Sequence, residues 1–186
     1  MLSDHIKTEP QAFFEELLSK ASNSNQSRYN NQVSSIYSSN RLKGSNYLKQ
    51  IPFSDLKVFQ TIFKSIPDQL QLQLANSSTI RYAQLFDLPK TVSVFCNRGT
   101  SGIDGSSSTA VGAAFVSKIP TLLITGDLSF FYDSNALWNT YLKKNFRIII
   151  INNQGGGIFM ILPGQKDTPT YDEYYETVHK RNAKDL

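Results

Sequence analysis

From about Ser54 onwards, short strand-like runs of apolar residues alternate with segments of helical periodicity. The strand-like runs are residues 70–75, 91–96, 121–125 and 147–151. The helical segments are residues 54–63, 79–86, 109–116 and 135–142. Strands that alternate with helices of this length predict an α/β fold, a parallel sheet with helices on both faces. The continuous apolar run 148–151 predicts a central strand that is covered on both faces.

The first 50 residues have a different character, because they are polar and rich in Asn and Ser. Residues 10–18 show an amphipathic helical pattern, and residues 21–31 read as a loop or as the turn into a second helix. This zone has too little apolar content to fold alone. We therefore expect residues 1–50 to be the tail of a preceding domain with a linker. Residues 51–186 would form the α/β domain, which ends without a closing strand and is expected to be incomplete at its C-terminal end.

Composition excludes several classes of protein. The 186 residues contain no apolar stretch long enough to span a membrane, and the N-terminus lacks the apolar region of a secretory signal. The net charge is +4, but the basic residues are scattered, so we expect no nucleic-acid partner. A single cysteine, Cys96, fits a reducing compartment, and we expect a cytoplasmic protein in which this thiol is a buried core residue. Both histidines, His5 and His179, lie in polar surroundings and are predicted at the surface.

Polar residues follow the predicted strands, at the sheet edge where ligands bind in parallel α/β folds. Asp127 offers an anionic oxygen, Asn153 an amide oxygen and Gly155 a main-chain carbonyl, which together suit Mg²⁺. Gly126 leaves room for a phosphate near the backbone, and the amides of Leu128 and Ser129 open toward an anion as the next helix begins. The sequence thus predicts a site for a cation and a phosphate group at this edge.

Three segments carry a resemblance to a known family. They are Asn97-Arg98-Gly99-Thr100-Ser101-Gly102-Ile103-Asp104-Gly105, Gly126-Asp127-Leu128-Ser129, and Asn152-Asn153-Gln154-Gly155-Gly156-Gly157-Ile158-Phe159 followed by Leu162-Pro163. Gly126-Asp127 with Asn152-Asn153 resembles the thiamine-diphosphate motif, in which Leu128 replaces the usual glycine. Taken together, the segments resemble the 2-succinyl-5-enolpyruvyl-6-hydroxy-3-cyclohexene-1-carboxylate synthases of menaquinone biosynthesis, where this leucine is usual.

The resemblance implies a thiamine-diphosphate-binding fold and a set of site residues. The cation, Mg²⁺ or Mn²⁺, would be held by Asp127, Asn153 and Gly155. The cofactor would further contact Ile103, which bends it, and Gly126, Leu128, Ser129 and Ile158. Substrate carboxylates or the pocket wall would involve Ser77, Arg81, Arg98, Phe159 and Leu162; guanidinium groups suit carboxylates because they pair with them bidentately.

The resemblance also implies that this chain is part of a larger enzyme. Family members decarboxylate 2-oxoglutarate and add the succinyl-semialdehyde carbanion to isochorismate. The glutamate that activates their cofactor lies on the pyrimidine-binding domain of a partner subunit in a homodimer or tetramer. This chain would correspond to the end of the central domain and most of the diphosphate-binding domain. We therefore expect no catalytic residue here and no activity from the isolated chain.

Two other functions stay open at this point. One is a different thiamine-diphosphate carboligase or decarboxylase of the acetolactate-synthase type, and the other is a non-catalytic binding module that retains the fold. Arg81 and Arg98 suit a dicarboxylate substrate and therefore favour the menaquinone-pathway synthase over an acetolactate-type enzyme. Intact Asp127, Asn153 and Gly155 argue against the loss of cation binding.

Overall fold

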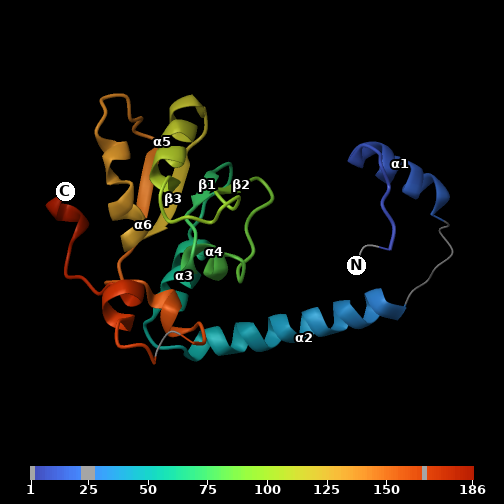
Figure 1. The fold of residues 1–186 in the computed structure, drawn as a ribbon, viewed down its shortest axis with the longest axis horizontal. Helices are drawn as coiled ribbons and strands as arrows, with labels where there is room; N and C mark the ends of the chain where they lie inside the picture. The colour runs from blue at the N-terminus through green and yellow to red at the C-terminus, as the bar shows by residue number, and fades with distance from the viewer. Residues whose placement is uncertain (1–2, 22–27, 165–166) are drawn as a thin grey trace. The chain divides into compact units, whose positions relative to one another are not determined.

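The computed structural model describes residues 3–21, 28–164 and 167–186. The chain divides into two compact units, Met1–Gln50 and Ile51–Leu186. The first unit contains α1 (Pro10–Lys20) and α2 (Arg28–Gln50), drawn in blue in Figure 1. The helix predicted over residues 10–18 is thus confirmed, whereas residues 22–27 of the predicted loop lie outside the described residues. Although α2 is long, it is polar, and no described helix combines the length and apolarity needed to cross a membrane.

The second unit is built on a four-stranded parallel sheet in the order β2-β1-β3-β4. The strands are β1 (Gln71–Leu74), β2 (Ser93–Cys96), β3 (Thr121–Gly126) and β4 (Phe146–Ile151). In the register, Leu72 lies beside Val94 on β2 and beside Leu122 on β3. All four strands were predicted from their apolar runs, and the predicted α/β fold is confirmed.

Helices cover both faces of this sheet (Figure 1). On one face, α3 (Asp55–Lys64) and α4 (Ser78–Ala83) close a core in which Phe59 and Leu72 are almost fully buried. Side chains alternate along a strand, so Leu123 points to the opposite face, where α5 (Ser106–Val116) and α6 (Asp127–Tyr132) lie. The small residues of α5, among them Ala110 and Ala114, allow this helix to pack closely on β3.

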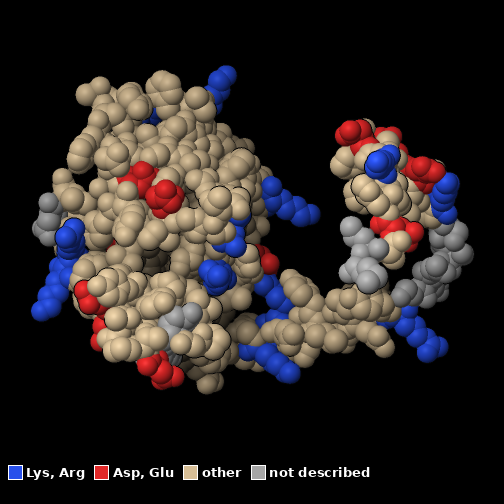
Figure 2. Space-filling model, viewed as in Figure 1, with Lys and Arg blue, Asp and Glu red and all other residues tan. Residues whose placement is uncertain are grey.

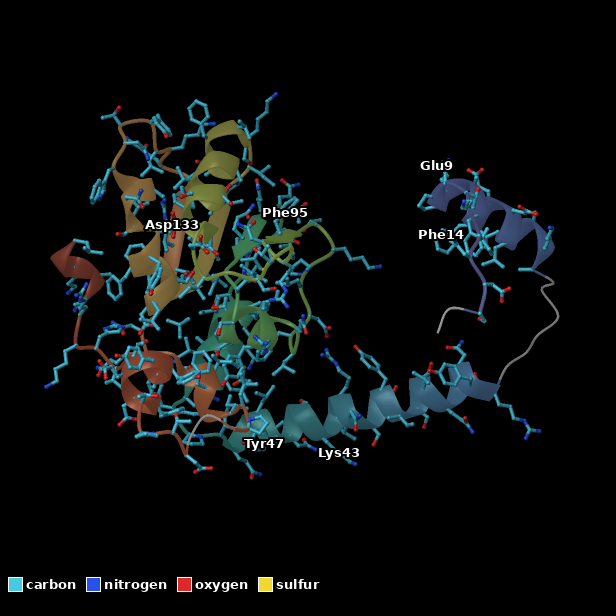
Figure 3. All side chains as sticks on the ribbon, in the orientation of Figure 1. Glu9, Phe14, Lys43, Tyr47, Phe95 and Asp133 are labelled. Atoms are coloured by element: carbon cyan, nitrogen blue, oxygen red, sulfur yellow. The ribbon has the colours of Figure 1, made fainter. Side chains whose placement is uncertain are left out.

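Asp133 links the two helices of the second face. Its carboxylate accepts a hydrogen bond of 2.7 Å from the amide of Ser108 and a further one from the Ser108 hydroxyl. Because Ser108 lies in the first turn of α5, Asp133 supplies the cap that Gly105 cannot. Figure 3 labels Asp133 beside α5 and α6. This contact fixes the end of α6 to the start of α5.

The position predicted for the last strand was wrong. β4 lies at an edge of the sheet rather than at its centre, and Ile148, Ile149 and Ile150 are only half-buried. Apolar character indicates that a strand is to be covered, but it does not say which element covers it. The apolar run 148–151 therefore predicted the strand β4 correctly but its position in the sheet incorrectly.

The helix predicted over residues 135–142 was also wrong. A short 3-10 turn, η1 (Ser134–Leu137), replaces it, after the earlier α6. Asp133 leaves helical geometry when its carboxylate turns to Ser108. Beyond the turn, the Asn139 side chain donates to the carbonyl of Ala136 and accepts from the amide of Tyr141. Such side-chain bonds compete with helical backbone bonds and end the helix.

Candidate functional site

A cleft lies at the carboxyl ends of the strands, at the sheet edge that the sequence predicted. It has an empty volume of about 610 Å³ and opens to solvent. Most of the predicted site residues line it, namely Ser77, Ile103, Gly126, Asp127, Leu128, Ser129, Asn153, Gly155, Ile158 and Phe159. The fold therefore brings together residues from four separate segments of the chain.

Asp127 is the buried acid of this cleft. It follows directly from β3 as the first residue of α6, and only 2% of its surface is exposed. Its Oδ1 accepts from its neighbour Leu128, whose amide nitrogen is 2.7 Å away, and its Oδ2 accepts from the Gly155 amide at 3.1 Å. Both donors are main-chain groups, so the carboxylate joins the end of β3 to the loop that follows β4.

Asn153 lies in that loop and is oriented by a second acid. Its Nδ2 donates to Asp55 Oδ2 at 2.9 Å. A carboxylate accepts hydrogen bonds but does not donate them, which fixes the amide nitrogen toward Asp55 and turns the carbonyl oxygen Oδ1 away from it. Asp55 is the first residue of α3 and also lines the cleft. The amide oxygen of Asn153 therefore remains available to bind a cation or to accept a hydrogen bond.

Gly155 is a glycine because the chain leaves no room for a side chain. Its φ is +158°, and a Cβ built there would lie 2.6 Å from the carbonyl oxygen of Glu176. The same close approach lets the neighbouring Gly156 amide donate to that carbonyl at 2.6 Å. The segment around residue 176 thus closes directly over the loop that follows β4.

The donor set suits a hard divalent cation. A carboxylate at Asp127, an amide oxygen at Asn153 and a main-chain carbonyl at Gly155 are ligands that Mg²⁺ accepts, with the remaining positions left for phosphate and water. Among the described residues, no three His, Cys, Asp or Glu side chains converge as metal ligands. A cation in this cleft would therefore depend on neutral oxygens beside Asp127.

Ile103 is held in the cleft by polar neighbours. The Ser129 hydroxyl donates to the Ile103 carbonyl at 2.5 Å, which joins α6 to the loop that follows β2. Asn76, at the end of β1, is 3% exposed and donates to the carbonyls of Asn97 at 2.8 Å and Gly102 at 2.6 Å. These bonds fix the backbone on both sides of the loop and so place Ile103.

Ser77 adopts a backbone conformation that L-residues avoid, with φ 64° and ψ −131°. It lies between β1 and α4 and lines the cleft. Strained conformations of this kind cost on the order of 1–3 kcal/mol and concentrate at functional sites. The strain turns the chain sharply at the cleft, where a glycine would be expected.

Three residues predicted to bind substrate do not line the cleft: Arg81, Arg98 and Leu162. Arg81 is exposed and donates to the carbonyl of Ser77 at 2.8 Å, while the exposed Arg98 donates to Asn76 Oδ1 at 3.1 Å. Each guanidinium group is therefore attached to a residue that does line the cleft. Leu162 follows the short 3-10 turn η2 (Gly157–Met160) and is 37% exposed.

Cys96 contributes to the core more than to the site. It is partly buried against the α3 face of the sheet. Burial raises the pKa of its thiol above the ordinary value, and the nearby Arg98 guanidinium lowers it by a smaller amount. The thiol is therefore mostly protonated at neutral pH, as expected for a structural cysteine.

Two site residues escaped prediction from the sequence. Asp55 was expected only to begin a helix, and its contact with Asn153 joins residues 98 positions apart. His179 was predicted at the surface, which was wrong: its side chain is 13% exposed and its Nε2 lies 3.2 Å from Asp127 Oδ2. Neither residue belongs to a spacing pattern, so no local signal marks them.

Known proteins resemble the chain along its whole length. A 2-succinyl-5-enolpyruvyl-6-hydroxy-3-cyclohexene-1-carboxylate synthase from Flavobacterium johnsoniae is 54% identical over 185 residues, which is 100% of this chain and 33% of the relative. The synthase of the same name from Flavobacterium psychrophilum is 53% identical over 185 residues, 100% of this chain and 34% of the relative. This chain is similar, over its whole length, to one part of these synthases.

A third synthase of the same name, from Christiangramia forsetii, is 60% identical over 141 residues, 76% of this chain and 24% of the relative. The chain spans about a third of the length of the two Flavobacterium synthases. Because those matches cover the whole chain, they include every segment that lines the cleft. No protein-family model matches the chain.

The strain at Ser77 leads to a first prediction. Ser77→Gly should raise the free energy of unfolding by on the order of 1 kcal/mol, because glycine adopts this conformation without strain. The control is Ser78→Gly, one residue on and inside α4, which should lower it by about 0.5–1 kcal/mol. Urea unfolding of the chain measures both. Equal destabilisation by the two substitutions would show that Ser77 stores no strain.

Proposed function

We propose that this chain supplies the diphosphate- and cation-binding part of a thiamine-diphosphate-dependent synthase of menaquinone biosynthesis. The enzyme would decarboxylate 2-oxoglutarate and join the remaining four-carbon unit to isochorismate. The observation that carries the proposal is the convergence of Asp127, Asn153 and Gly155 on one cleft at the strand ends. The names of the relatives support the reaction, and the chemistry of the donors supports the cofactor.

The residues present fit a divalent cation beside a diphosphate group. Asp127, Asn153 and the Gly155 carbonyl would hold Mg²⁺ or Mn²⁺, and Gly126 would leave space for phosphate beside the amides at the start of α6. Ile103 and Ile158, which both line the cleft, would contact the cofactor. When bound, thiamine diphosphate supplies the electron sink for decarboxylation and carbon–carbon bond formation. The chain's own part is to bind, orient and exclude water.

Substrate carboxylates would be bound near the end of β1. Ser77 and Phe159 line the cleft, while Arg81 and Arg98 hold Ser77 and Asn76 from outside its lining. Two guanidinium groups on adjacent lining residues place positive charge next to the cleft, which favours the dicarboxylate 2-oxoglutarate or the acid isochorismate. Leu162 would complete the apolar wall beyond Phe159.

The remaining parts of the enzyme would come from outside this chain. The glutamate that activates the cofactor would lie on the pyrimidine-binding domain of a partner subunit, in a cytoplasmic homodimer or tetramer. Residues 1–50 would form the end of the central domain and a linker, and residues 51–186 most of the diphosphate-binding domain. The isolated chain would not turn over substrate.

The cation site yields the second prediction. In the full-length protein, Asp127→Asn should weaken Mg²⁺-dependent binding of thiamine diphosphate by roughly tenfold to a hundredfold, since a charge-assisted contact contributes about 1.5–3 kcal/mol. Isothermal titration calorimetry measures this affinity. The control is Asp172→Asn, which removes an exposed carboxylate in the π-helical turn η3 (Tyr171–Glu176). Unchanged affinity in Asp127→Asn would remove Asp127 from the cation site.

The third prediction concerns the two arginines. In the full-length protein, Arg98→Ala and Arg81→Ala should each lower kcat/KM for at least one acid substrate by about tenfold to a hundredfold. Affinity for the cofactor should stay nearly constant, because neither residue lines the cation site. Arg→Lys at the same positions keeps the charge but loses bidentate pairing, so it should recover only part of the loss. Normal kinetics for both acids, with a lowered melting temperature, would assign the arginines a structural role.

A further inference from the structure

The segment 176–181 passes close to Asp127 and has no role in the function proposed above. We refer to these residues as the C-terminal strap. The Glu176 carbonyl accepts from the Gly156 amide at 2.6 Å, and the His179 amide donates to the Gln154 carbonyl at 3.1 Å. At its far end, the Arg181 carbonyl accepts from the Asn152 side chain at 3.3 Å. The strap is therefore attached to the loop after β4 at three points, on the residues that flank Asn153 and Gly155.

These attachments place the His179 ring against Asp127. Its Nε2 lies 3.2 Å from Asp127 Oδ2, and the ring meets Phe131 of α6 edge to face at a centroid distance of 5.2 Å. Nε2 is buried and, among the described residues, forms no hydrogen bond. The contact is a close approach of nitrogen and oxygen rather than a linear hydrogen bond.

The proton on the ring is fixed by the other ring nitrogen. Nδ1 accepts a hydrogen bond of 3.1 Å from the Arg181 amide. A nitrogen that accepts cannot carry the proton, so the neutral ring carries it on Nε2, the atom that faces Asp127. The ring N–H of His179 therefore lies on the nitrogen that is 3.2 Å from Oδ2, the oxygen that accepts from the Gly155 amide at 3.1 Å.

His179 approaches the carboxylate from outside the cleft. Asp127 and Gly155 line the cleft, but His179 does not. The Gly155 amide donates to Oδ2, and the His179 ring lies next to the same oxygen without a formed hydrogen bond. The other oxygen, Oδ1, accepts from the Leu128 amide at 2.7 Å and retains a lone pair. Held in this way, the carboxylate cannot rotate freely.

We propose that His179 is a positioning residue for Asp127: when the divalent cation binds, the ring N–H, placed 3.2 Å from Oδ2 by the C-terminal strap, donates to the carboxylate and holds it in its binding orientation. The inference rests on the proposed cation site and deepens it. Partners behind a metal ligand orient it and tune its affinity, and their removal typically costs about 10- to 100-fold in metal affinity.

The test is Mn²⁺ binding to the full-length protein in the presence of thiamine diphosphate, followed by electron paramagnetic resonance. His179→Leu removes the N–H donor and should raise the Mn²⁺ dissociation constant about 10- to 100-fold. His179→Gln retains a side-chain N–H and should recover most of the affinity. Val178→Ala changes an exposed neighbour in the strap and should bind as the wild type does. If His179→Leu fails to fold, His179→Ser takes its place, since its hydroxyl is too short to reach Oδ2.

The outcomes separate this inference from the proposed function. If the wild type binds Mn²⁺, Asp127→Asn does not, and His179→Leu binds normally, the cation site stands and the role of His179 is refuted. If the wild type binds no Mn²⁺, the proposed cation site and the role of His179 are both refuted. Spin-echo spectra report nitrogen bound directly to Mn²⁺: none is expected, and an imidazole signal would overturn the positioning role by making His179 a ligand. Weakened binding in His179→Leu with no recovery in His179→Gln would likewise contradict it.

Discussion

The carboxylate of Asp127 is almost completely buried, and the arrangement of the strand ends follows from that burial. A buried carboxylate costs several kcal/mol unless hydrogen-bond donors surround it. The amide of Leu128 comes with the start of α6, but the second amide must come from Gly155 in a loop that follows another strand. The parallel pairing of β3 and β4 brings Gly126 beside Ile151, and the contact with Gly155 then holds the loop after β4 against Asp127, where the cleft forms.

The other polar contacts extend this arrangement along the sheet edge. Asn76 fixes the loop that carries Ile103, Ser129 holds the Ile103 carbonyl, and Asp55 orients Asn153. Each bond joins two segments that are far apart in the sequence, so the cleft is set by side-chain contacts between loops rather than by one motif. Figure 2 shows charged side chains dispersed over the face in view, which sets the buried Asp127 apart from the surface charge.

Local patterns in the sequence predict those parts of the structure that are determined locally. Apolar runs predicted the four strands, and Ser54 begins α3 as a capping serine should, accepting from the Lys57 amide at 3.4 Å. The residues at the strand ends predicted the cleft because parallel strands meet at one edge. The patterns could not predict that β4 lies at an edge, or that Asp133 would end a helix by capping α5, because both depend on neighbours distant in the chain. His179 is the clearest example, since only the path of the C-terminal strap brings it to Asp127.

The most direct test of the account is the location of the cation itself. Crystals of the full-length protein grown with thiamine diphosphate and Mn²⁺ would give an anomalous difference peak at the metal. One peak is expected in this cleft, about 2.1 Å from an Asp127 oxygen, from Asn153 Oδ1 and from the Gly155 carbonyl oxygen. A bound cofactor whose cation lies elsewhere, without contact to Asp127, would contradict it.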